Sequence, residues 1–162
     1  MRRKVKFPNR LVPDSVYDSA KVAKLTNYLM EDGKKEVARK IVYDCFNQIK
    51  EVTKSEPLEV FNEAMRNVGP LMELKSRRVG GANYQIPHEV TPERRLVLAL
   101  RWIIEAAYSK KGKPMHKKLA DEIITASKNE GEAIKKRENV HRMAEANRAF
   151  AHYAKSYKKK TV

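Results

Sequence analysis

Residues 74–87 of the chain, LKSRRVGGANYQIP, contain side chains that could bind phosphate groups and stack on bases. Two short runs flank a glycine pair; one run carries three cations and the other a tyrosine. A guanidinium can donate two parallel hydrogen bonds to a phosphate, and a tyrosine ring can stack on an unpaired base. The residues that we expect to make such contacts are Lys75, Arg77, Arg78, Gly80, Gly81 and Tyr84. The two glycines would do so through close approach of their backbone.

A second basic row is expected on the last helix, which starts near residue 132. At about 100° per residue, five of its side chains fall within about sixty degrees of one another. No acidic residue interrupts this row, which favours a surface facing phosphate groups, although a solvated helix face is the commoner reason for such charges. The row consists of Arg137, His141, Arg148, His152 and Lys155, while Arg142 points elsewhere.

The two ends of the chain hold much of its positive charge. The net charge is +15, and residues 1–13 and 151–162 supply nine of these charges without a single acidic residue. Such segments repel themselves and need a polyanion to become ordered. They could act as solubilising tails, but nucleic acid is the better interpretation, since neither an apolar helix face nor a lipidation signal points to a membrane. The cations of the first segment are Arg2, Arg3, Lys4, Lys6 and Arg10.

Patterns typical of enzymes are absent from the sequence. The four histidines, at positions 88, 116, 141 and 152, lack the spacing of metal ligands. Residues 32–35 (DGKK) lack the preceding glycine of a phosphate-binding loop, and there is no nucleophile elbow. Cys45 lies in an apolar stripe and is expected in the core. As the only cysteine it suits a reducing compartment. We therefore expect a cytoplasmic protein that is not an enzyme and uses no cofactor.

These side chains must be positioned by helices, because apolar residues recur at three- and four-residue steps along most of the chain. The pattern predicts a mainly α fold, with about six helices in one compact bundle. The helix that begins after Thr91 is apolar nearly all round and should be central. In the second helix, the predicted buried stripe runs from Val37 to Val52. The six helices are predicted over residues 19–32, 35–52, 57–68, 92–109, 115–128 and 132–153.

A two-stranded β-hairpin is predicted between the third and fourth helices, because both glycines of the pair can adopt positive φ in a tight turn. With these glycines as the turn, Arg78 pairs with Asn83 and Arg77 with Tyr84. Neither face is apolar enough to lie on a core, so the hairpin should project by roughly 20 Å. The two arginines would then face solvent on opposite sides and could contact two nucleic-acid backbones.

Several blocks in this order closely resemble the bacterial small-subunit ribosomal protein seven family. The blocks are LMEDGKK at 29–35, IVYDC at 41–45, KSRRVGGANYQ at 75–85, RR at 94–95, LRW at 100–102, and KKRE at 135–138 with HRMAEANRAFAHY at 141–153. The resemblance covers residues 11–153. Departures from the family's pattern lie at His88, at Tyr108 and in the lysine-rich C-terminus, and they affect local contacts.

The resemblance implies a primary binder of small-subunit ribosomal RNA that nucleates assembly of the subunit head from the 3′ major domain. It places the hairpin near the tRNA exit site and the decoding region, with exit-site tRNA and mRNA nearby. It also implies ribosomal proteins nine and eleven of the small subunit as partners, and the ribosome in the cytoplasm as the location. Basic and aromatic residues in or near the blocks join the expected RNA contacts: Lys34, Lys35, Arg94, Arg95, Arg101, Trp102, Lys110, Lys113, Lys136 and Arg142.

The expected organisation is a basic extension at 1–13, a helical RNA-binding domain at 14–153 and a basic tail at 154–162. The hairpin would occupy residues 73–90.

Arg94 and Arg95 lie in a first helical turn, where cations oppose the helix dipole. An external anion or an internal glutamate would offset this unfavourable interaction equally well.

The main alternative function is that of a DNA-bending architectural or regulatory protein. Such proteins insert an apolar wedge between bases, and Val-Gly-Gly-Ala at the hairpin tip is a poor wedge.

Overall fold

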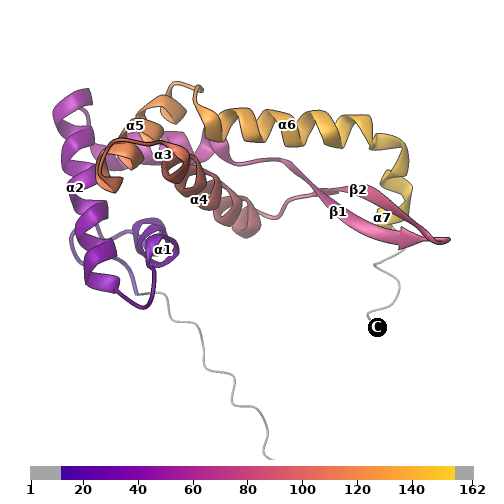
Figure 1. Cartoon of the computed structure of the whole chain (residues 1–162), viewed down its shortest axis with the longest axis horizontal. Coiled ribbons are helices and arrows are strands. Elements are labelled where there is room, and N and C mark those ends of the chain that lie inside the picture. The colour runs from indigo at the N-terminus through magenta and orange to yellow at the C-terminus, as the bar shows by residue number, and fades with distance from the viewer. Residues whose placement is uncertain (1–11, 156–162) are drawn as a thin grey trace, which may run out of the picture.

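The computed structural model describes residues 12–155 of the chain, and within them the predicted order of helices and strands is confirmed. Three helices precede a β-hairpin, and three long helices, a 3₁₀ turn and a short helix follow it (Figure 1). Six helices in this part of the chain have ten or more residues: α1 Ala20–Leu29, α2 Lys35–Thr53, α3 Pro57–Val68, α4 Pro92–Ser109, α5 Met115–Ser127 and α6 Glu132–Ala146. The strands are β1 Met72–Val79 and β2 Ala82–Glu89. A 3₁₀ turn, η1 Arg148–Ala151, and a short helix, α7 His152–Lys155, follow α6.

The core is formed by α1 to α5 and by Ala133 and Ile134 in the first turn of α6. The helix α4 is central to it, as its apolar sequence predicts. Leu100, Ile103 and Ala107 of α4 are fully buried. Cys45 is also fully buried, and burial raises the pKa of its thiol well above the ordinary value. The prediction for α2 is wrong at its ends, because Val37 and Val52 are 58% and 62% exposed. Both lie in terminal turns of α2, beyond the packed part of the stripe.

A buried carboxylate, that of Glu122 in α5, joins three parts of the chain. Its Oε1 accepts a hydrogen bond from the backbone N–H of Ala133 at 3.1 Å, and its Oε2 lies 2.6 Å from Nζ of Lys110. The first contact satisfies an N–H of the first turn of α6, which has no partner inside its own helix. The adjacent Gly131 has φ +100°, and a Cβ there would lie 2.9 Å from Oε1 of Glu122. Glycine is therefore required at this helix start.

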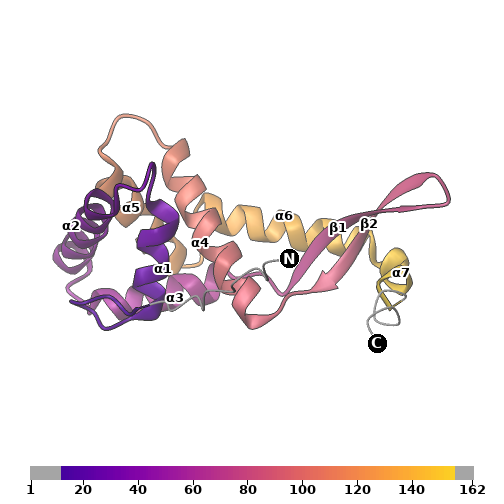
Figure 2. The ribbon, with the colours of Figure 1, turned by 90° about the horizontal axis from the view of Figure 1, so that it is seen from below.

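The hairpin has the predicted register, with Arg78 opposite Asn83 and Arg77 opposite Tyr84. Gly80 and Gly81 form its turn with φ +57° and +93°, values that L side chains rarely adopt. The hairpin and α6 extend together away from α1 to α5 (Figure 2). The molecule thus consists of a helical body and an extension made of the hairpin and α6.

The last helix is shorter than predicted, because α6 ends at Ala146 and does not continue to Tyr153. The side-chain amide of Asn147 donates to the carbonyl of Met143 at 2.8 Å, an alternative to helical bonding that asparagine offers the backbone. The N–H of Phe150 then bonds the carbonyl of Asn147 in a 3₁₀ turn. The chain from Arg148 to Lys155, called the C-terminal segment below, consequently leaves the axis of α6 and packs against β2.

Candidate nucleic-acid interface

One face of the hairpin is occupied by the C-terminal segment. The ring of Tyr84 packs against Phe150 and Tyr153, with ring centroids 5.0 Å and 5.9 Å apart. On the same face, Nη1 of Arg77 donates to the carbonyl oxygen of Tyr153 at 2.9 Å. The expectation that both arginines face solvent is therefore wrong for Arg77, and the Tyr84 ring already has aromatic partners. We call this face, which carries Arg77 and Tyr84, the covered face.

The opposite face remains open toward the turn. Four side chains lie on it, and all four are exposed: Ser76, Arg78, Asn83 and Gln85. Leu74 and Pro87 share the register of this face nearer the root, but they are half-buried and buried, respectively. At the far end of β2 the exposed Glu89 shares the same register, opposite Met72. We call the stretch from Ser76 and Gln85 to the turn the open face.

Glu73 supplies the internal carboxylate at the root of the hairpin. Its two carboxylate oxygens lie 3.2 Å from Nζ of Lys75 and 3.1 Å from Nε of Arg94. Burial acts to raise the pKa of the Glu73 carboxyl, but the hydrogen bonds and charges of Lys75 and Arg94 together hold that pKa below its ordinary value. The sequence left open whether an external anion or an internal glutamate offsets the cations in the first turn of α4. For Arg94, the internal glutamate Glu73 does so.

Arg95 has a different role, because it donates to backbone oxygens at the end of α3. Its Nε bonds the carbonyl of Gly69 at 3.0 Å and its Nη2 bonds that of Arg66 at 3.1 Å. Arg137 of α6 donates to the neighbouring carbonyl of Asn67. These carbonyls lie at the negative end of the α3 dipole, where cations are stabilising. A Cβ at Gly69 would meet Nε of Arg95 at 2.7 Å, so glycine leaves the space that this arginine fills.

His141 completes the contacts of α6 with the chain that leads into β1. Its Nε2 accepts a hydrogen bond from the backbone N–H of Leu71 at 3.1 Å, which requires the neutral ring. Burial, and then the charges of Arg137 and Arg95, lower the pKa of His141. The predicted row on the last helix is therefore divided: Arg137 and His141 hold the hairpin root, while Arg148 and His152 lie beyond the end of α6 and are exposed.

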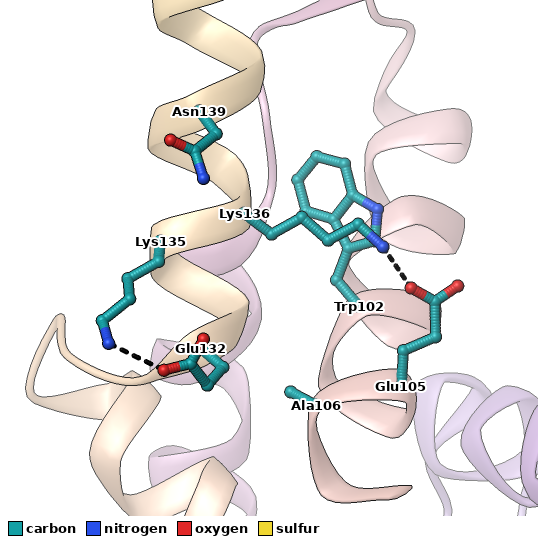
Figure 3. Close-up of a pocket in the computed structure, with 7 residues that line it drawn as sticks. All are labelled: Trp102, Glu105, Ala106, Glu132, Lys135, Lys136 and Asn139. Carbon is teal, nitrogen blue, oxygen red and sulfur yellow. Dashed lines mark hydrogen bonds and ion pairs between the residues drawn. The ribbon is translucent and has the colours of Figure 1, made fainter. Parts of the chain in front are cut away.

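A shallow pocket of about 260 Å³ lies between α4 and α6 (Figure 3). The side chain of Lys136 passes the indole of Trp102, with Nζ 5.9 Å from the ring centroid, and pairs with Glu105. Trp102 is only 7% exposed, so its ring is not available as an open stacking surface. A second ion pair, between Lys135 and Glu132 at 2.7 Å, lines the same pocket.

Tyr28 of α1 is a candidate contact that was not predicted. The guanidinium of Arg101 in α4 lies 5.5 Å from the centroid of its ring, and this contact connects the exposed sides of the two helices. Both side chains are exposed, and a cation above an aromatic ring can present a flat surface to a base. The available signal was an aromatic residue on the polar side of an amphipathic helix. Beside this pair, the hydroxyl of Tyr108 donates to Glu31 at 2.8 Å.

The predicted cations fall into three groups. Those of the N-terminal extension, Arg2, Arg3, Lys4, Lys6 and Arg10, lie outside the described residues, and Lys155 falls in α7. A second group lies within ion-pair distance of a carboxylate: Lys34, Lys75, Arg94, Lys110, Lys113, Lys136, Arg137 and Arg148. In the described part of the chain, no such carboxylate is found for Lys35, Arg77, Arg78, Arg95, Arg101 and Arg142.

Residues 12–155 contain no group of three or more histidine, cysteine, aspartate or glutamate side chains that could hold a metal ion. None of the helices there combines the length and the apolar character needed to cross a membrane.

Comparison with known proteins gives one family. The family model described as ribosomal protein S7p/S5e matches residues 1–148. The small ribosomal subunit protein uS7 of Thermotoga maritima is 59% identical over 153 residues, which are 94% of this chain and 99% of that protein. The proteins of the same name from Caldanaerobacter subterraneus and Moorella thermoacetica are 58% and 53% identical, with the same coverage. These matches do not support the DNA-bending alternative, and the chain belongs to the ribosomal protein S7p/S5e family.

Proposed function

We propose that the protein is a structural constituent of the small ribosomal subunit and binds its ribosomal RNA. Membership of the ribosomal protein S7p/S5e family supports the location in the ribosome. The observation that carries RNA binding is a set of exposed cations for which the described residues supply no carboxylate. Among the predicted contacts it includes Lys35 at the start of α2, Arg78 on the hairpin, Arg101 on α4 and Arg142 on α6. Such side chains can donate to phosphate oxygens without first breaking an internal ion pair.

The finer parts of the proposal concern place and neighbours. We propose that the protein binds the 3′ major domain, helps to nucleate the subunit head in the cytoplasm, and lies beside ribosomal proteins nine and eleven. The hairpin would then approach exit-site tRNA and mRNA. The elongated form of the molecule supports the placement of the hairpin, because the hairpin and α6 extend away from α1 to α5 (Figure 1). The exposed side chains of the hairpin are polar. The other parts are supported by the resemblance to the family.

A salt titration tests the proposal. The full chain is bound at equilibrium to a transcribed 3′ major domain of a bacterial small-subunit ribosomal RNA. If about eight phosphates are contacted, log affinity should fall against log salt with a slope of about −6 to −7. A slope of about −1 to −2 would contradict binding through several separated cations. Duplex DNA at equal concentration is the competitor control, and its displacing the RNA would favour the DNA-binding alternative.

A further inference from the structure

The two faces of the hairpin differ in what they can offer a ligand. On the covered face, Lys75 is paired with Glu73, Arg77 donates to the carbonyl of Tyr153, and the Tyr84 ring lies against two other rings. A ligand binding there would have to displace the C-terminal segment. The open face has no such cover, and its side chains are exposed from Ser76 to the turn.

We infer that the open face is the surface through which the hairpin contacts RNA, and that the covered face is reserved for the C-terminal segment. This inference rests on the proposed function and assigns three contact residues in addition to Arg78. They are Ser76, Asn83 and Gln85. It also assigns Arg77 and Tyr84 as positioning residues, which act on RNA binding only by holding the hairpin against the C-terminal segment.

The register makes the open face one compact patch. Arg78 lies directly opposite Asn83, and Ser76 directly opposite Gln85. Residues paired in this way have Cβ atoms about 4.5–5.5 Å apart on the same side of a ribbon. The four side chains therefore lie close enough together to contact one or two neighbouring nucleotides.

The side chains of the patch suit RNA more than a protein surface. The Arg78 guanidinium can donate to a phosphate, and no carboxylate in the described part of the chain lies within ion-pair distance of it. The Asn83 and Gln85 amides each present both a donor and an acceptor. Such groups can bond base edges or a ribose 2′-hydroxyl, which both donates and accepts. From Ser76 and Gln85 to the turn, this face carries no acidic residue and no exposed large apolar side chain. The exposed Glu89 shares its register only at the root, opposite Met72.

Footprinting with matched variants tests the assignment. The full chain and its variants are bound to the transcribed 3′ major domain, and affinity and hydroxyl-radical protection are measured. Arg78→Ala should weaken binding about tenfold and remove protection of the nucleotides beside the hairpin. The combined change Ser76→Ala, Asn83→Ala and Gln85→Ala should remove protection of the same nucleotides. The control, Lys75→Ala, removes one charge from the covered face and should change affinity by about twofold or less.

Hydrogen exchange of the hairpin amides, measured on each variant, separates contact from folding. The inference requires that Arg78→Ala leave this exchange unchanged and that Arg77→Ala increase it. It is overturned if Arg78→Ala and Lys75→Ala weaken binding equally. It is also overturned if Arg77→Ala removes the protection while the hairpin amides exchange as in the unchanged chain. An unchanged chain that protects no RNA refutes the proposed function itself. Normal protection that no variant alters refutes the face assignment alone.

Discussion

The carboxylate of Glu122 lies where the loop after α4, the helix α5 and the first turn of α6 meet. It is fully buried, and its oxygens contact the Ala133 N–H and the Lys110 ammonium. Glu122→Ala should lower the free energy of unfolding by about 3 kcal/mol, because a buried N–H and a partly buried cation lose their partner. Urea unfolding measures this change.

Two further variants control the Glu122 experiment. Glu122→Gln keeps an oxygen that can accept from the Ala133 N–H but loses the negative charge, so its loss of stability should be intermediate. Glu130→Ala removes an exposed carboxylate close in sequence and should change stability by about 0.5 kcal/mol or less. Equal effects of Glu122→Ala and Glu130→Ala would show that the buried contacts contribute nothing.

His141 makes the root of the hairpin sensitive to pH. Its pKa is lowered from 6.5, first by burial and then by Arg137 and Arg95, so the unfolded chain binds a proton at higher pH than the folded chain. The stability from the neutral ring is therefore complete above pH 6.5 and is lost as the pH falls through the lower folded pKa. A protonated Nε2 would also place a donor opposite the Leu71 N–H. Glu145 and Arg148 line the adjoining groove, and only Glu145 would favour the charged ring.

Stability measured between about pH 7 and pH 5 tests this prediction. Protection factors of the amides at the hairpin root, which correct the exchange rate for its intrinsic dependence on pH, should fall over this range. His141→Gln should remove most of the dependence, while His152→Gln, which changes an exposed ring in the C-terminal segment, should keep it. A dependence that persists in His141→Gln would assign the titration to another group.

At the scale of helices and strands, the contacts of the C-terminal segment define how firmly the hairpin is held. Phe150→Ala removes the ring nearest to Tyr84 and should weaken the hairpin by about 1 kcal/mol, a typical value for an aromatic pair. Faster hydrogen exchange of β1 and β2 amides would report this, with thermal unfolding of the helical body little changed. The body should resist because Phe150 does not belong to its core.

A double-mutant cycle sharpens the Phe150 experiment. The effects of Phe150→Ala and Tyr84→Ala should not add, because each removes the same ring contact. Tyr108→Ala, which changes a half-exposed ring far from the hairpin in the chain, serves as control and should leave hairpin exchange unchanged. Additive effects of the two hairpin variants would show that the rings do not stabilise each other.

The sequence predicted these elements well where local signals were strong. Proline at the first turn of α3 and α4 and the glycine pair of the hairpin determine local backbone geometry, so helix starts and strand register could be read directly. The end of α6 could not be read in this way. Its cause is a side-chain bond of Asn147 together with apolar packing of Phe150 on a strand more than sixty residues earlier. No local pattern contains that contact.

At the scale of the whole molecule, composition predicted a polyanion-binding protein but not which cations are available to bind it. Arg94, Arg95 and Arg137 look alike in the sequence as candidate phosphate contacts. In the folded chain Arg94 pairs with Glu73, whereas Arg95 and Arg137 bond backbone carbonyls at the end of α3. Each partner is distant in sequence, so only the fold distinguishes these structural arginines from an exposed one such as Arg78.

The covered face has a consequence for how the protein is made. Arg77 and its acceptor, the Tyr153 carbonyl, are 76 positions apart, so a ribosome synthesises both strands long before the residues that cover them. A growing polypeptide thus carries an uncovered, loosely held hairpin until the last helical turns leave the exit tunnel. The hairpin reaches full stiffness only after Tyr153 has left the tunnel, and truncated products that stop short of Phe150 would lack it.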